Sequence, residues 1–365
     1  MTAAHSAKNT RSEPGLDAFR CLAVVMMFVV HAFRLQAPRS RSSGGALEAL
    51  LELFMWAEPY VAATFLFVAG ISLVLSKRKA KSTAVWLRKL ALRALGLYAL
   101  SVLLFVAQFG VDLPDLLASS GILSAIAVAI VLTGLMLASP KPNWALAALG
   151  IATVGVGSYL EATARTVSGL NGGPGGAVPL IAFTAFGALL ARLVQRRGKR
   201  ALGWVIALTA PLCAFAVFSH AAWTQNVVSR YADLGGQLAV TALWDPELLA
   251  RAPHSAVVFW NHSVVGVAGL LLPLSASLAV ALFAPKRAFA ARGFGPVLLV
   301  GRHALAVYVM HLGVLGVLDV AGVTPPSAAW TWVTIAALFA LAVAVAFVLE
   351  RRPQRLLFGL RAAER

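Results

Sequence analysis

Long apolar blocks dominate this chain and limit what it can fold into. They are about 20 residues long, the length that crosses the hydrocarbon layer of a membrane as a helix, and they follow one another along most of the sequence. Apolar residues make up 60% of the chain, charged residues only 12%, and the mean hydropathy is +0.82. These values lie outside the range of ordinary soluble domains. The sequence therefore predicts an all-α, polytopic membrane protein.

The blocks predict a bundle of about ten transmembrane helices. The eighth block is long enough to include a kink at Pro273. We expect a disordered cytoplasmic N-terminus over 1–16, one transmembrane domain over 17–350 and a basic cytoplasmic tail over 351–365. The expected spans are 18–36, 57–76, 91–110, 119–139, 143–160, 177–194, 201–220, 256–284, 295–318 and 328–349.

The formal net charge of +17 follows the membrane topology. With the N-terminus in the cytoplasm and alternating spans, the inner segments hold 25 Lys and Arg against 4 Asp and Glu. The outer segments hold 6 and 10. This is the positive-inside pattern, and it places both termini in the cytoplasm. The charge is thereby accounted for, and no nucleic-acid partner is expected.

Three outer connections are long, and the known chemical motifs are missing from the sequence. Residues 37–56 are expected to lie along the interface as a short amphipathic helix, 161–176 are rich in glycine, and 221–255 are the most polar. The two cysteines, Cys21 and Cys213, both fall in apolar spans. We therefore expect no disulfide framework, no metal site and no bound cofactor.

The first span carries two ionisable residues on one face. Ten uncharged residues separate Arg20 from His31, so a helix places both side chains on one stripe, about 16 Å apart along its axis. Asp17 lies three residues before Arg20 and can pair with it. Glu58 opens the second span, where a short loop would place its carboxylate beside the imidazole. Ionisable residues inside a span are costly, which marks them as candidates for a functional site.

Two of these residues, His31 and Arg20, also have a plainer explanation. A lone histidine in a helix bundle is commonly a packed, hydrogen-bonded structural residue. Arg20 at the inner end of the span is, on the same view, an anchor that extends its charge to the interface.

Several segments resemble a known family. RSEPGLDAFRCLAVVMMFVVHAF resembles the opening of the bacterial transmembrane acyltransferases, whose hallmark is Arg, ten residues, then His after a Leu-Asp pair. Cys21 stands where that family usually has Gly. EPYVAATFLFVAGISLVLS, WLRKLALRALGLYAL, SGILSAIAVAIVL and VGRHALAVYVMHLGVL are similar, in order, to segments of the heparan-α-glucosaminide N-acetyltransferase-like branch.

The resemblance implies acyl transfer across a bilayer. Cytoplasmic acyl-CoA, with acetyl-CoA as the expected cosubstrate, would bind the inner basic surface through its phosphates. The candidate residues there are Arg20, with its neighbour Asp17, and Arg88 and Arg93, although positive-inside anchoring explains the last two equally well. His31 would be the general base or the nucleophile.

The remaining expectations concern the acceptor, the tunnel and the partners. Tyr308 and His311 in the ninth span would line the acyl path, with a core role as the alternative for the histidine. The acceptor would be a hydroxyl or amine of a sugar or glycan outside the cytoplasm. The other partner is the lipid bilayer, here the bacterial inner membrane, and the sequence allows a homo-oligomer. A secondary transporter or exporter of a small solute is the competing class, and a non-catalytic scaffold is a third.

Overall fold

A computed structural model of the chain consists of α-helices joined by turns and short connections. All elements that it describes are helical, which confirms the expected all-α fold. The chain divides into two compact units, one of Met1–Ser43 with Ser277–Arg365 and the other of Gly44–Ala276. The structure describes residues 13–36, 45–46, 49–50, 58–163, 165, 167–171, 176–178, 180–233, 264–291, 293–323 and 326–351.

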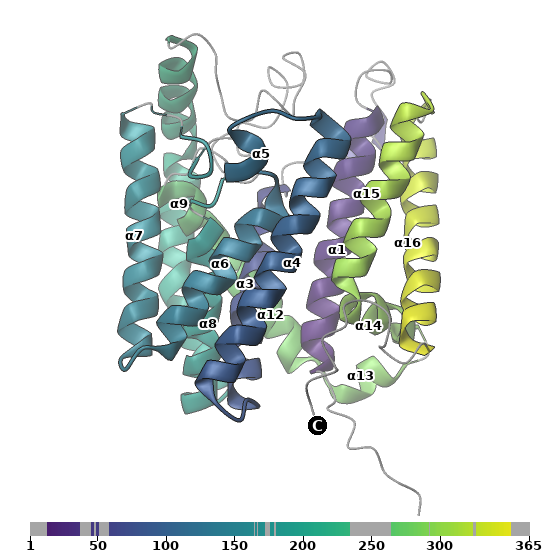
Figure 1. Ribbon diagram of the computed structural model, residues 1–365. Coiled ribbons are helices and arrows are strands. Elements are labelled where there is room, and N and C mark those ends of the chain that lie inside the picture. The colour runs from purple at the N-terminus through teal and green to yellow at the C-terminus, as the bar shows by residue number, and fades with distance from the viewer. Residues whose placement is uncertain are drawn as a thin grey trace, which may run out of the picture. The chain divides into compact units, whose positions relative to one another are not determined.

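The first unit, called unit 1, joins the first helix to the last ones. Within it α1, α15 and α16 run side by side, and α14 packs against both α1 and α16 near one end of these helices (Figure 1). The helices of unit 1 are α1 (Pro14–Gln36), α13 (Lys286–Ala290), α14 (Phe294–Arg302), α15 (Ala304–Val320) and α16 (Ala328–Arg351).

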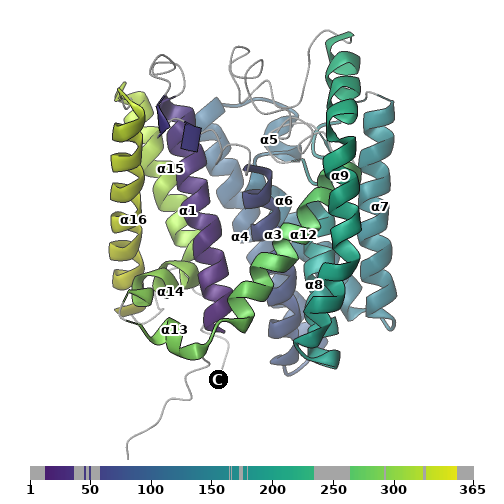
Figure 2. The same cartoon turned by 180° about the vertical axis from the view of Figure 1, so that it is seen from behind.

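The second unit, called unit 2, is built around one central helix, α8 (Leu180–Arg197), which packs against α3, α6, α7 and α9 (Figure 2). Residues along most of α8 are buried. The unit boundary falls inside α12 (Val264–Phe283). The other helices of unit 2 are α3 (Glu58–Arg78), α4 (Thr83–Phe109), α5 (Asp115–Ala118), α6 (Ile122–Ala138), α7 (Pro142–Ala162) and α9 (Arg200–Asp233).

Each of the ten expected spans corresponds to helix in the structure, and the polytopic membrane class is confirmed. Seven described helices are long and apolar enough to cross a membrane, and the bent pair α14 and α15 gives an eighth if it counts as one span. Of the other two regions, α6 has only 17 residues. The second, α8, carries arginine at 192, 196 and 197. The count of ten and the cytoplasmic placement of both termini stay predictions.

The expected ninth span, 295–318, is wrong as a single straight helix. The chain bends by 88° between α14 and α15, and only His303 separates the two helices. The φ and ψ angles of His303 are −105° and 24°, outside the helical values, so the residue ends one helix and starts the next. An apolar sequence pattern reports hydrophobicity along the chain but gives no sign of a change in its direction.

One of the expected outer connections, 221–255, differs in the structure. Helix α9 continues through Asp233, so the segment 221–255 begins as helix. The remainder of that segment and most of 37–56, with its expected interfacial helix, lie outside the described residues.

Glycine lets α3 and α8 approach closely in unit 2. A Cβ atom added at Gly70 would collide with the backbone carbonyl of Thr184, and one added at Gly187 would collide with the carbonyl of Phe67. Small residues at a contact allow two helix backbones to pack at short range, which is how helices associate inside lipid. This contact fixes α3 on the central helix.

We expect Gly187→Ala to lower the free energy of unfolding in detergent micelles by about 1–3 kcal/mol, because the methyl group forces the two backbones apart. Gly155→Ala in α7 is the matched control, since nothing lies within 4 Å of its Cβ position. That change should be neutral or stabilise the helix by up to about 1 kcal/mol. Equal unfolding midpoints for the two variants would contradict the packing argument.

Candidate functional site

Helix α1 presents the three ionisable residues that the sequence singled out in this span. It begins at Pro14, a favoured residue for a first helical turn, and Asp17 lies in that turn, where a negative charge interacts favourably with the helix dipole. Nη1 of Arg20 donates a hydrogen bond to Oδ1 of Asp17 at 3.0 Å. The expected pairing is therefore present. The carboxylate side chain is only 2% exposed, so it needs cationic partners to remain charged there.

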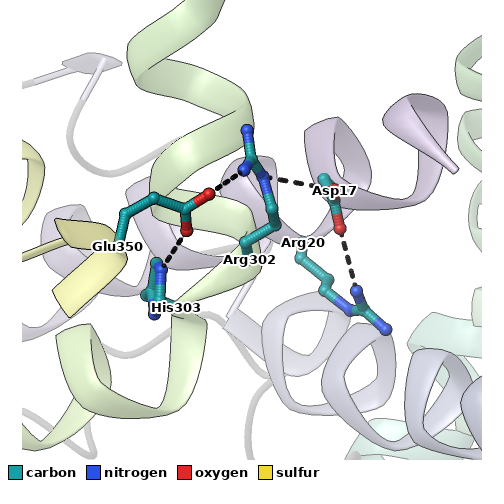
Figure 3. A network of polar contacts seen from close by, with 5 residues as sticks. All are labelled: Asp17, Arg20, Arg302, His303 and Glu350. Carbon is teal, nitrogen blue, oxygen red and sulfur yellow. Dashed lines mark hydrogen bonds and ion pairs between the residues drawn. The ribbon is translucent and has the colours of Figure 1, made fainter. Parts of the chain in front are cut away.

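A second arginine reaches the same carboxylate from α14. Nε of Arg302 lies 3.8 Å from Oδ2 of Asp17 (Figure 3). The preceding residue makes this approach possible, because a Cβ atom at Gly301 would collide with the backbone carbonyl of Asp17. The two helices therefore cross in backbone contact at the level of the ion pairs.

Glu350 of α16 holds the bend between α14 and α15. Its Oε1 accepts a hydrogen bond from Nη1 of Arg302 at 2.5 Å, and its Oε2 lies 2.9 Å from Nε2 of His303 (Figure 3). The two residues at the corner are thus bound by one carboxylate. We call Asp17, Arg20, Arg302, His303 and Glu350 the corner network.

Sequence reasoning missed three members of the corner network. Arg302 and His303 fall inside the expected ninth span, and Glu350 directly follows the expected tenth span. A signal for the first two was available, because adjacent ionisable residues inside an apolar segment are rare and have partners. Nothing in the sequence linked them to Asp17, which precedes them by more than 280 residues.

Eleven residues along α1 from Arg20, His31 meets His311 of α15. Nδ1 of His31 lies 2.8 Å from Nε2 of His311, within hydrogen-bond distance. The ring planes differ by only 6° and the centroids are 5.1 Å apart. This separation is that of two rings placed edge to edge, because each ring adds its own radius to the distance between the two nitrogens. The hydrogen bond therefore lies in the shared plane of both rings.

Aromatic rings from α1 and α15 lie beside the His311 member of this pair. His311 is fully buried, with the rings of Phe28 and Tyr308 at centroid distances of 5.2 and 5.4 Å. His31 is half-buried. The structure thus brings together three of the residues expected along the acyl path, two histidines and one tyrosine.

The other expected site residues lie in unit 2. Arg88 and Arg93 occupy exposed positions of α4, and Glu58 is the first residue of α3. Their proposed relation to His31 stays a prediction, since His31 belongs to unit 1. Among the described residues, no group of three or more His, Cys, Asp and Glu side chains is arranged to hold a metal ion.

A protein family model matches more than half of this chain. Residues 13–221 match the family model described as heparan-alpha-glucosaminide N-acetyltransferase, catalytic. The match covers more than half of the 365 residues and includes all of α1. It ends before α15 and α16, so Arg302, His311 and Glu350 lie beyond it. A search of curated proteins gave no match.

We expect Asp17→Asn to lower the free energy of unfolding by about 2 kcal/mol, because both arginines lose a charged partner in a buried contact. Unfolding in mixed micelles measures the effect. Asp112→Asn, at an exposed position of unit 2, is the control and should leave the midpoint unchanged. A midpoint for Asp17→Asn equal to that of the control would show that the corner network adds nothing to stability.

Proposed function

The chain belongs to the heparan-alpha-glucosaminide N-acetyltransferase family, and we propose that this membrane acetyltransferase moves an acetyl group from cytoplasmic acetyl-CoA to an extracytoplasmic sugar. The acceptor group is an amine or a hydroxyl of the sugar or glycan. The protein is a multi-pass integral membrane protein, and the membrane we propose is the bacterial inner membrane. The observation that carries the proposal is that Arg20 and His31 lie on one face of α1, within the residues that the family model matches.

The positive-inside charge pattern supports a cytoplasmic donor. It places the end of α1 that carries Arg20 on the inner side of the membrane. There the Arg20 side chain, which donates to Asp17 at 3.0 Å, is 24% exposed, and its guanidinium group is proposed to bind a phosphate. Arginine binds phosphate through two parallel hydrogen bonds, which suits the polyphosphate end of coenzyme A. Arg88 and Arg93 are proposed as further phosphate contacts.

The proposed path of the donor follows α1 outward. Arg20 and His31 lie about 16 Å apart along the helix axis, a length that the extended pantetheine arm can cover. The thioester would then reach the histidine from the cytoplasmic side while the sugar reaches it from the other. Helix α15 packs against α1, and its Tyr308 is proposed to line the path.

We propose His31 as the general base. Its imidazole takes the proton from the attacking amine or hydroxyl as the new C–N or C–O bond forms. The thioester C–S bond breaks, and the proton passes to the departing thiolate of coenzyme A. Glu58 is proposed to stabilise the charged imidazole during the transfer.

His31→Ala should abolish the release of coenzyme A from labelled acetyl-CoA, a loss of roughly 100-fold or more in kcat, because the proton acceptor is removed. Val30→Ala, a buried neighbour on the same helix, controls for lost packing and should retain activity. If the wild-type protein leaves acetyl-CoA intact but moves a solute across proteoliposomes, the protein is a transporter and the proposed function is wrong.

Arg20→Lys separates coenzyme A binding from stability. The ammonium group still pairs with Asp17, but it lacks the planar fork that binds a phosphate through two bonds. We expect an unchanged unfolding midpoint and an affinity for coenzyme A about tenfold lower by calorimetry. Unchanged affinity would exclude Arg20 from the phosphate site.

A further inference from the structure

His311 is expected from the sequence to line the acyl path, and its contacts in the structure point to a more specific role. The family match stops at residue 221, so nothing in it concerns this histidine. It is fully buried, two aromatic rings contact its imidazole, and its Nε2 lies 2.8 Å from Nδ1 of His31.

Only one of these two facing nitrogens can carry the hydrogen that they share, provided both rings are neutral. Two arrangements fit this distance. Either Nδ1 of His31 donates to Nε2 of His311, or Nε2 of His311 donates to Nδ1 of His31. They differ in whether Nε2 of neutral His31 carries a lone pair or a hydrogen.

The proposed role of His31 as general base requires the first arrangement, because the base needs a lone pair on Nε2. With a hydrogen on Nδ1, neutral His311 offers a lone pair at Nε2, which accepts the hydrogen bond from Nδ1 of His31. A neutral His31 with hydrogen on Nδ1 must then carry its own lone pair on Nε2. The near-coplanar geometry of the two rings aligns this hydrogen bond and fixes the rotation of the His31 ring.

We propose that His311 is the positioning residue of the acetyl transfer, holding His31 in the tautomer whose Nε2 accepts the proton of the acceptor. This inference rests on the proposed function. When His31 becomes positively charged, its hydrogen bond to His311 becomes charge-assisted and therefore stronger. A neutral imidazole provides this support without the cost of a second buried charge.

The test compares two substitutions of similar size that differ in their ability to accept a hydrogen bond. His311→Leu removes the acceptor, and we expect kcat to fall roughly 100-fold while KM for acetyl-CoA changes little. His311→Gln keeps an acceptor oxygen and should recover about tenfold of that loss. Leu315→Ala, one turn further along α15, is the packing control and should keep wild-type kcat.

A second measurement needs no activity. In protein labelled with ¹⁵N-histidine and free of substrate, the His31 signals are identified by their absence in His31→Gln. The ¹⁵N shifts should show hydrogen on Nδ1 of His31 and none on Nε2, and His311→Leu should remove this preference. A hydrogen on Nε2 of wild-type His31 would overturn the proposal.

The outcomes separate this inference from the proposed function. If kcat depends on His31 but is the same in His311→Leu and wild type, the transferase function stands and the positioning role is overturned. If the wild-type protein releases no coenzyme A, the proposed function fails, and with it the catalytic part of this inference. The hydrogen bond between the two rings is then decided by the ¹⁵N shifts alone.

Discussion

The buried carboxylate of Asp17 is the constraint on which unit 1 depends. A charged group that is 2% exposed is stable only with cations beside it, and Arg20 and Arg302 supply them from two different helices. Gly301 lets the backbone of α14 reach the carbonyl of the same aspartate. The position of α14 on α1 is therefore fixed at one point. There the two backbones must fit closely and the ion pair with Asp17 must form.

The direction of α15 follows from that crossing. The chain turns by 88° immediately after Arg302, and the Glu350 carboxylate binds both corner residues from α16. A rigid helix that starts at a fixed corner also fixes the residues further along it. His311 lies two turns from that corner, where it meets His31. The ion pairs at one end of α1 and the histidine pair further along it are thus linked through the geometry of one helix.

The proposed chemistry depends on both ends of this link, the ion pairs and the histidine pair. The cationic end of α1 suits a phosphorylated donor, and the apolar surroundings of the histidine pair suit a proton transfer shielded from water. A buried neutral histidine can orient a second histidine without adding a charge to a medium in which an uncompensated charge is costly. Replacing His311 with an apolar residue of similar size separates the orienting effect of its hydrogen bond from its packing.

The sequence by itself determined the membrane class, the helical character of the apolar blocks, the pairing of Arg20 with Asp17 and the placement of Arg20 and His31 on one face. These properties follow from hydrophobicity and helix periodicity, which act over a few turns of chain. Only the tertiary structure decided the bend at His303, the joining of Arg302 to both Asp17 and Glu350, and the contact of His31 with His311. The partners in those contacts are separated by 47 residues for His303 and Glu350 and by 285 residues for Asp17 and Arg302. No local pattern encodes such pairings, because they arise when helices pack and buried charges and hydrogen-bonding groups must find partners.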